Sequence, residues 1–272
     1  MHPDLATYLE GEVARSARYD EKTKCFHYTR GGGDGREIQC GGIHNWLRTL
    51  FYPHYKSNRS RRNHGSVSIV GSSHKQGVLV DTQLQMAAQG KEIPPKKLHK
   101  MTNAILEWLR ARGHELQAAQ VPVELAQGWS RMTRADLITR CAADGRLWLW
   151  EIKTGFPVGF FRAQGTFAND PLADVPCTQK NIWLLQLHYT HQALCTMARL
   201  PIEAGCARVL QVYAKKQGQG SALVVEEHAP PPWLTSRVPL LAPPPLGLGV
   251  PVSRKKRPPP SEQEDDPLLL LQ

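Results

Sequence analysis

The chain of 272 residues lacks any long apolar run, and its six cysteines form no Cys-x-x-Cys pair. Its apolar Leu268–Leu271 stretch is far too short to cross a bilayer, so we expect no membrane-spanning segment. Met1 is not followed by the basic and then apolar stretch of a signal peptide. The scattered cysteines are therefore expected to be free thiols, and their spacing argues against an iron–sulfur cluster.

Zinc binding is one alternative for the cysteines. Cys25 and His27 lie close in sequence to Cys40 and His44, and these residue types are common zinc ligands. Their spacing matches no familiar zinc motif, so zinc binding stays the minor alternative.

Acidic residues are scarce relative to basic ones. The formal net charge is +10 and the pI is about 9.4, a balance that favours a polyanionic partner. Between His54 and Lys100, nine Lys or Arg residues accompany only two acids. Such a density suits phosphate contact, and Tyr52 and Tyr55 could stack on bases. The candidate DNA-binding residues here are Lys56, Arg59, Arg61, Arg62 and Lys75. The alternative is a solvated basic loop.

The most informative stretch is Arg134–Gly155, where Asp144-Gly145 separates two runs rich in Leu, Ile, Trp and Thr. This pattern predicts a hairpin with a two-residue turn. Asp136 would then lie opposite Lys153, with Glu151 diagonally adjacent on the same face. Both faces of the ribbon are otherwise apolar, so both should be covered and these charges partly desolvated. Two carboxylates beside a lysine are a natural seat for a hard divalent cation.

Periodicity along the rest of the chain predicts three helices, at residues 77–89, 95–112 and 178–199. It also predicts strands at 114–125, 207–215 and 221–228. Residues 1–65 show no sustained pattern, and from Ala229 onward prolines and charges produce a composition that cannot build a core. The order of elements predicts an α/β or α+β fold, with one mixed sheet flanked by helices.

Asp136 followed by Glu151-Ile152-Lys153 resembles the D…E-x-K signature of the PD-(D/E)XK nuclease superfamily. Gln186-Leu187-His188-Tyr189 is similar to a helix motif of its RecB-type and lambda-exonuclease-like branch. Gly77-Val78-Leu79-Val80-Asp81 offers Asp81 where those relatives carry a metal-binding histidine. The chain departs from the pattern at Arg134-Ala135, where the namesake proline is missing. The resemblance covers roughly Ser66–His228 and does not explain the first 65 residues.

The resemblance implies a restriction-endonuclease-like fold, with a nuclease core at 66–229. Residues 1–65 would be an accessory region, basic at its end, and 230–272 a disordered Pro-rich tail. It also implies that Asp136, Glu151, the Ile152 carbonyl and Asp81 hold one or two Mg²⁺ or Mn²⁺ ions. Lys153 would position or help deprotonate the attacking water, or stabilise the scissile phosphate. Gln186 would orient the water, Lys153 or the DNA backbone through hydrogen bonds.

Two of these residues have a plain structural alternative. Tyr189 is a candidate DNA contact, but at helical spacing from Ile182 and Leu185 it is as often a core residue. Asp81 is, with similar weight, an acid on a helix surface.

A basic cluster in the C-terminal tail, Arg254, Lys255, Lys256 and Arg257, is typical of a nuclear import signal. The alternative is a charged solubilising tail in a protein that stays in the cytoplasm. Nuclear import would fit a eukaryotic host, or a virus or mobile element within one.

These observations favour a Mg²⁺-dependent deoxyribonuclease, foremost an exonuclease that processes DNA ends in recombination, repair or replication. Its partners would be DNA and a recombination or replication protein. The runner-up within the same class is a structure-specific endonuclease or resolvase. From another class, the alternative is a catalytically inactive nuclear DNA-binding module on the same fold.

Overall fold

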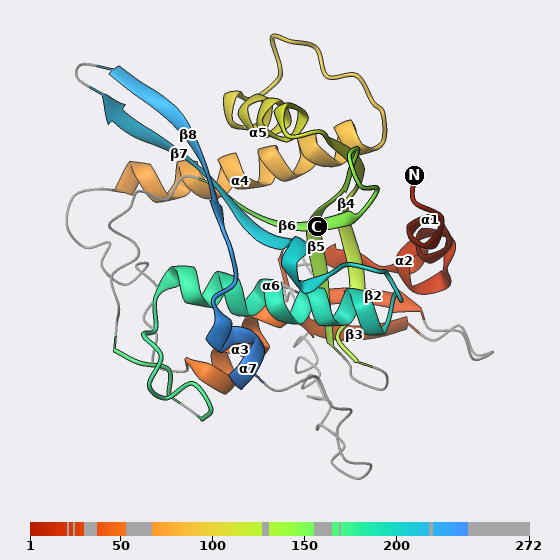
Figure 1. Ribbon diagram of the computed structural model, residues 1–272, viewed down its shortest axis with the longest axis vertical. Helices are drawn as coiled ribbons and strands as arrows, with labels where there is room; N and C mark the ends of the chain where they lie inside the picture. Colours follow the sequence, from red (N-terminus) through yellow and green to blue (C-terminus); the bar gives the residue numbers. More distant parts are fainter. Residues whose placement is uncertain are drawn as a thin grey trace, which may run out of the picture.

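The computed structural model describes residues 1–20, 22–23, 25–29, 37–52, 67–126, 131–154, 165–168, 170–217 and 220–238. In this part of the chain, helices cover both faces of a central mixed sheet of eight strands (Figure 1). The helices are α1 (Pro3–Glu10), α2 (Glu12–Ser16), α3 (Ile43–Phe51), α4 (Val67–Ala88), α5 (Lys100–Ala111), α6 (Gln179–Thr196) and α7 (Pro232–Arg237), with a 3-10 turn, η3, at Ala204–Cys206. The strands are β1 (Arg18–Asp20), β2 (Cys25–Thr29), β3 (Glu37–Gly42), β4 (His114–Glu124), β5 (Arg131–Cys141), β6 (Leu147–Thr154), β7 (Ala207–Gln217) and β8 (Gly220–His228).

The sheet runs in the order β1-β2-β3-β5-β6-β7-β8, and β4 pairs with β5. The β3–β5 and β6–β7 pairs are parallel, and the others are antiparallel. β4 pairs with one edge of β5 along most of the length of β5, so β3 and β6 must both pair with the other edge. β3 pairs at Arg131 and Met132, whereas β6 pairs only from Leu137 to Arg140. The sheet therefore forks along β5, between Met132 and Leu137.

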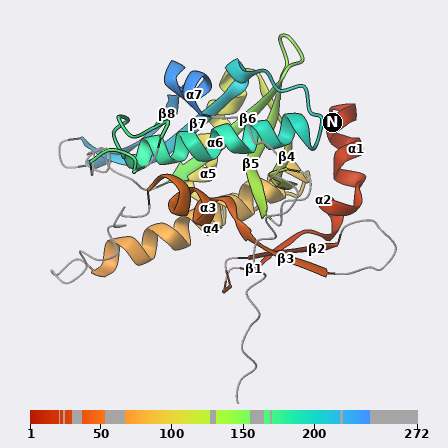
Figure 2. The ribbon, with the colours of Figure 1, turned by 90° about the horizontal axis from the view of Figure 1, so that it is seen from below.

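Each face of the sheet has its own apolar core, with α4 and α5 on one side and α6 with α3 on the other (Figures 1 and 2). On the α4 side, Leu137, Trp150 and Ile152 pack against Val80 and Ile105. On the α6 side, residues such as Ile138, Leu147 and Leu149 pack against helix α6, more than half of whose residues are buried. This arrangement confirms that both faces of the central hairpin are covered. The six cysteines are all free.

The helices predicted from periodicity are present, with altered ends. α5 begins at Lys100 rather than Pro95 because the His99 Nδ1 caps it, accepting the N–H of Met101 at 3.4 Å. The Thr178 hydroxyl caps α6 in the same way, accepting the N–H of Asn181 at 3.0 Å. α4 begins at Val67 rather than Gly77. The prediction placed its start too late because the polar and glycine-containing stretch before Gly77 shows no apolar stripe.

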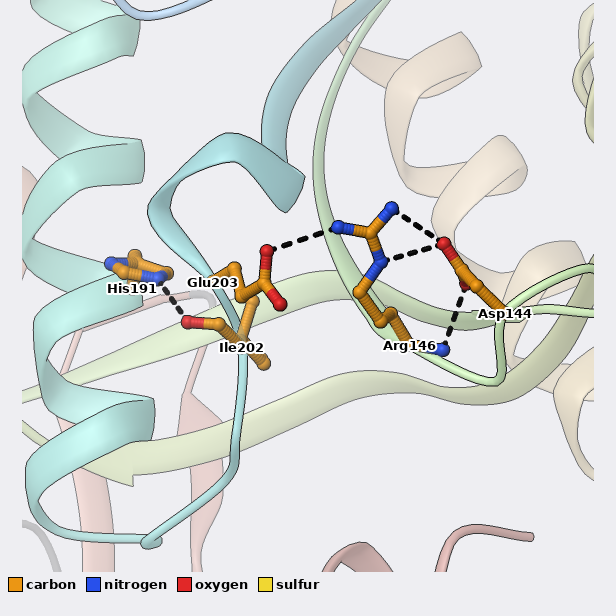
Figure 3. Close-up of polar contacts among 5 residues, drawn as sticks. All are labelled: Asp144, Arg146, His191, Ile202 and Glu203. Atoms are coloured by element: carbon orange, nitrogen blue, oxygen red, sulfur yellow. Dashed lines mark hydrogen bonds and ion pairs between the residues drawn. The ribbon is translucent and has the colours of Figure 1, made fainter.

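The predicted two-residue turn of the central hairpin is wrong. The N–H of Cys141 donates to the Arg146 carbonyl at 2.9 Å, so the loop takes four residues, 142–145. Asp144 accepts the backbone N–H of Arg146 at 3.0 Å and its Nε at 2.6 Å, and Arg146 also donates to Glu203 at 3.0 Å (Figure 3). These contacts of Arg146 with Asp144 and Glu203 favour the longer loop. Gly145, at φ +73°, takes the left-handed conformation that glycine tolerates.

The longer loop shifts the strand register by two residues. Leu137 faces Trp150, so extending the register brings Asp136 level with Glu151 rather than with Lys153. A shift of two residues leaves every side chain on the same face, because side chains alternate with a period of two. The predicted grouping of the charged residues is thus compatible with the corrected register.

The described strands among the first 52 residues, where the sequence predicted only an accessory region, extend the core sheet. β1, β2 and β3 form an antiparallel meander, and the parallel pairing of β3 joins it to the start of β5. At the other end, α7 lies within the segment predicted to be disordered. It packs against α6, with Leu234 and Val238 buried. Residues 239–272, including the basic cluster at 254–257, lie outside the described residues.

Both β4 and β5 are irregular at the fork. In β4, Ala118 and Val121 belong to the same core although they are three residues apart, and Gln120 between them has a φ of +57°. In β5, Ala135 and Ile138 share that core in the same way. The β4–β5 register, in which Ala119 faces Leu137 and Val121 faces Ala135, brings Gln120 level with Asp136. A paired kink therefore interrupts the alternation of both strands at Asp136.

Candidate active site

Asp136 lies at the fork and replaces a missing ladder contact with its side chain. Its Oδ2 accepts the backbone N–H of Ile152 at 2.9 Å, just beyond the last β5–β6 pair. A backbone N–H inside a sheet needs an acceptor. The carboxylate supplies it here and is fixed beside β6, where Glu151 and Lys153 follow on either side of Ile152.

Glu151 and Lys153 form a buried ion pair, with the Lys153 Nζ on the Glu151 Oε1. The side chain of Glu151 is only 1% exposed and that of Lys153 is 18% exposed. The backbone of both residues is paired in parallel with β7. The two charges are therefore held on a rigid strand and largely removed from water.

Burial and neighbouring charge change the proton affinity of both groups. Burial, reinforced by the negative charge of Asp136, raises the pKa of Glu151 to about 8, even though Lys153 opposes this shift. Burial disfavours the charged Lys153 amine, but the carboxylates around it, chiefly Glu151 and Asp136, outweigh burial and raise its pKa. The charges of Glu151, Asp136 and Asp81 thus all act on the Lys153 ammonium, and a further cation would lower the remaining repulsion among the carboxylates.

Asp81 is the third carboxylate. It lies on α4, and its charge contributes to the raised pKa values of both Glu151 and Lys153. α4 comes close to the end of β6 at Gly77, where a Cβ would lie 3.4 Å from the Thr154 Oγ1. A small residue at position 77 therefore lets α4 approach β6 and brings Asp81 toward the strand fork.

The charged residues of the site, Asp81, Asp136, Glu151 and Lys153, do not form a complete metal centre. Within the described residues, no three His, Cys, Asp or Glu side chains are grouped closely enough to hold a metal ion. This holds for the Cys25, His27, Cys40 and His44 set as well. Asp136 and Glu151 nevertheless fit a hard cation by type, since both are carboxylates and the buried Glu151 is paired with Lys153.

His44 was not predicted as part of this site, yet the structure brings it near Lys153. It lies in the first turn of α3, two residues after the strand that pairs with β5. Desolvation of its imidazole, with the positive charges of Lys153 and Arg48, lowers the pKa of His44. Its Nδ1 is 3.4 Å from the Tyr52 hydroxyl. No sequence signal indicated His44, because its approach depends on the β3–β5 pairing.

α6 carries two of the predicted site residues, Tyr189 and Gln186. Tyr189 is only 1% exposed and packs edge-on against Trp46, with ring centroids 5.0 Å apart, and stacks on Phe51 at 6.5 Å. The prediction that Tyr189 contacts DNA is therefore wrong, and it is a core residue. Gln186 is half-buried on α6, and no hydrogen bond among the described residues joins it to Asp136, Glu151 or Lys153.

The predicted basic surface is described only at its end. Lys75 is exposed on α4, upstream of Gly77. Lys56, Arg59, Arg61 and Arg62 lie outside the described residues, as do Arg254, Lys255, Lys256 and Arg257. None of the described helices is long and apolar enough to cross a membrane.

Comparison of the chain with protein-family models, with curated proteins and with solved structures finds no match.

Proposed function

We propose that this protein is a divalent-metal-dependent DNA nuclease with a restriction-endonuclease-like core, and foremost an exonuclease acting on DNA ends. The observation that carries the proposal is the buried Glu151–Lys153 pair beside Asp136 at the fork of the sheet. A salt bridge that served stability alone would gain little from burial, because desolvation offsets most of the attraction. Buried charges with shifted pKa values are more typical of functional sites.

Asp136, Glu151 and the Ile152 carbonyl are the groups that would hold the metal, with Asp81 as a further carboxylate. A bound Mg²⁺ would supply Lewis acidity toward the attacking water and the scissile phosphate. The protein's part is to hold these oxygens in place. The Ile152 N–H fixes the Asp136 carboxylate, and the pairing of β6 with β7 fixes the backbone of Glu151.

Lys153 is suited to donate hydrogen bonds rather than to take up a proton. Its pKa is raised, so the amine stays protonated at neutral pH. A buried ammonium can stabilise negative charge that develops on the phosphate, and can orient the attacking water. Cation binding would draw Glu151 away from Lys153 and release the amine for this contact.

One observation favours a non-catalytic DNA-binding module as the second candidate. Lys153 already contacts the Glu151 carboxyl directly, and the described residues contain no group of three metal-ligand side chains. A chain that kept the fold but lost the metal would retain this closed ion pair. The basic net charge of +10 suits either function.

Cleavage of linear and circular DNA in Mg²⁺ distinguishes the candidates. Wild type is expected to degrade linear DNA, and Lys153→Ala to be slower by a factor of at least about 100, as for loss of one charge-stabilising donor. Lys22→Ala is the matched control, because Lys22 is exposed between β1 and β2 and lies outside the basic stretch of residues 54–100.

Nicking of circular DNA would indicate an endonuclease instead, and binding without cleavage a non-catalytic module. Equal cleavage by wild type and Lys153→Ala would remove Lys153 from the site.

A further inference from the structure

A cavity of about 490 Å³ opens beside the candidate site, between α4, β4 and the N-terminal elements α2, β1 and β2. α4 and α2 both pack against β4, and Figure 1 shows α2 beside β4 on the side that α4 reaches. Asp81 lines this cavity, and its charge also acts on Glu151 and Lys153. The cavity therefore adjoins the candidate active site. Cavities of about 300–1,000 Å³ commonly hold small ligands, so this one has room for a single nucleotide unit.

Gln120 presents an unused hydrogen-bonding group at this cavity. Its amide Nε2 and Oε1 are both buried, and neither has a hydrogen-bond partner among the described residues. Its backbone is also held at a φ of +57°, a conformation that residues with side chains rarely adopt. Such strain persists where the surroundings impose it and is concentrated at binding sites. A carboxamide offers one donor and one acceptor side by side, the pattern that matches the edge of a nucleobase.

Aromatic and positively charged side chains line the cavity near β1 and β2. The rings of Tyr19 and Phe26 lie 4.8 Å apart at a tilt of 52°, and both line the cavity. The Arg134 guanidinium lies 5.1 Å from the centroid of the Tyr19 ring. Aromatic rings stack on unpaired bases, and arginine binds phosphate, so these walls carry the chemistry of single-strand recognition.

We propose that this cavity binds one unpaired nucleotide of a DNA strand, with its base at the Gln120 amide and its phosphate toward Arg134. The proposal rests on the nuclease function proposed above and narrows its substrate to single-stranded or splayed ends. A base within a duplex cannot enter this cavity unless it is first flipped out of the stack, so an unpaired base is favoured. Asp81 also lines the cavity, and its negative charge disfavours a phosphate beside it.

Binding of a short single-stranded oligodeoxynucleotide with 2-aminopurine at one end tests the proposal. The full chain is titrated in EDTA, which prevents cleavage, and the fluorescence of the modified base is followed. Gln120→Leu is expected to weaken binding by about tenfold, the scale of one lost amide–base contact. Gln120→Glu keeps the side-chain shape but removes the amide donor, and is expected to lose affinity similarly.

Gln39→Leu is the matched control, since Gln39 is exposed on β3 away from the cavity, and should bind as wild type does. Circular dichroism checks that each variant is folded. Wild-type affinity in both Gln120 variants would overturn the proposal, as would a blunt duplex or single-stranded RNA that binds better than single-stranded DNA. Displacement of the strand by a free deoxynucleoside monophosphate would support a nucleotide cavity that needs no strand. Failure to displace it would support recognition of a nucleotide within the strand.

The two proposals fail separately. Strand binding that depends on Gln120, without cleavage in Mg²⁺, would refute the nuclease function and leave the nucleotide cavity standing. Cleavage that depends on Lys153 but is unaffected in both Gln120 variants would refute the nucleotide cavity and leave the nuclease function standing.

Discussion

Replacement of Glu151 by glutamine should change how the stability of the metal-free protein depends on pH. The carboxyl of Glu151 has an ordinary pKa of 4.5, which burial, reinforced by Asp136, raises to about 8 in the folded chain. Between these values the folded state binds a proton that the unfolded state releases. Stability from this group is therefore complete below about pH 4.5 and is lost as the pH rises toward 8.

Each pKa unit corresponds to about 1.4 kcal/mol, so between pH 5 and pH 8 wild type should lose at most about 4 kcal/mol through Glu151. Glutamine has the same shape and cannot ionise. Glu151→Gln should lie within about 1 kcal/mol of wild type at pH 5, where both folded side chains are neutral, and should exceed it at pH 8 by an amount that approaches this limit.

Urea unfolding in EDTA at pH 5 and pH 8 measures the effect. Glu107→Gln is the control, because Glu107 is exposed on α5 and should leave the pH dependence unchanged. Saturating Ca²⁺ at pH 8 should stabilise wild type and not Glu151→Gln, since the proposed ligand is then missing. If the free energy of unfolding depends on pH in the same way in wild type and Glu151→Gln, the inference that burial and Asp136 raise the pKa of Glu151 is refuted.

Two further outcomes follow from the packing. Tyr189→Ala should lower the free energy of unfolding by about 3–5 kcal/mol, as for a large aromatic residue lost from a core. Tyr189→Phe should leave the affinity for single-stranded DNA unchanged, and weaker DNA binding by this variant would show that the Tyr189 hydroxyl contacts DNA. Gln120→Gly should raise the free energy of unfolding by about 1 kcal/mol, because glycine tolerates the left-handed φ of +57° and leaves no buried amide unpaired. A lower stability for Gln120→Gly in urea unfolding would mean that the amide has a partner in the folded protein.

Local sequence patterns determined the order and type of the elements from α4 to β8. Leu, Ile and Trp on both sides of the β6 strand required that both sheet faces be covered, and α4–α5 and α6 cover them. The alternation of side chains also placed Glu151 and Lys153 on a common face of β6, where they form an ion pair. These features depend on periodicities of 2 and 3.6 residues, which a single sequence displays directly.

The register of the hairpin was decided by the tertiary structure. A two-residue shift leaves the alternation of faces unchanged, so no apolar pattern distinguishes the predicted register from the observed one. The contact between Arg146 and Glu203, which are far apart in sequence, favours the four-residue loop.

Only the tertiary structure brought the N-terminal residues to the site. His44 approaches Lys153 because β3 pairs in parallel with the start of β5, a non-local contact that no segment of the first 52 residues encodes by itself. The kink that brings Gln120 level with Asp136 likewise depends on two strands adjusting to each other. The sequence thus determined which side chains carry charge and, within a regular strand such as β6, on which face they lie. Strand pairing across long separations decided which of them meet, because the energy of such contacts is absent until the sheet has formed.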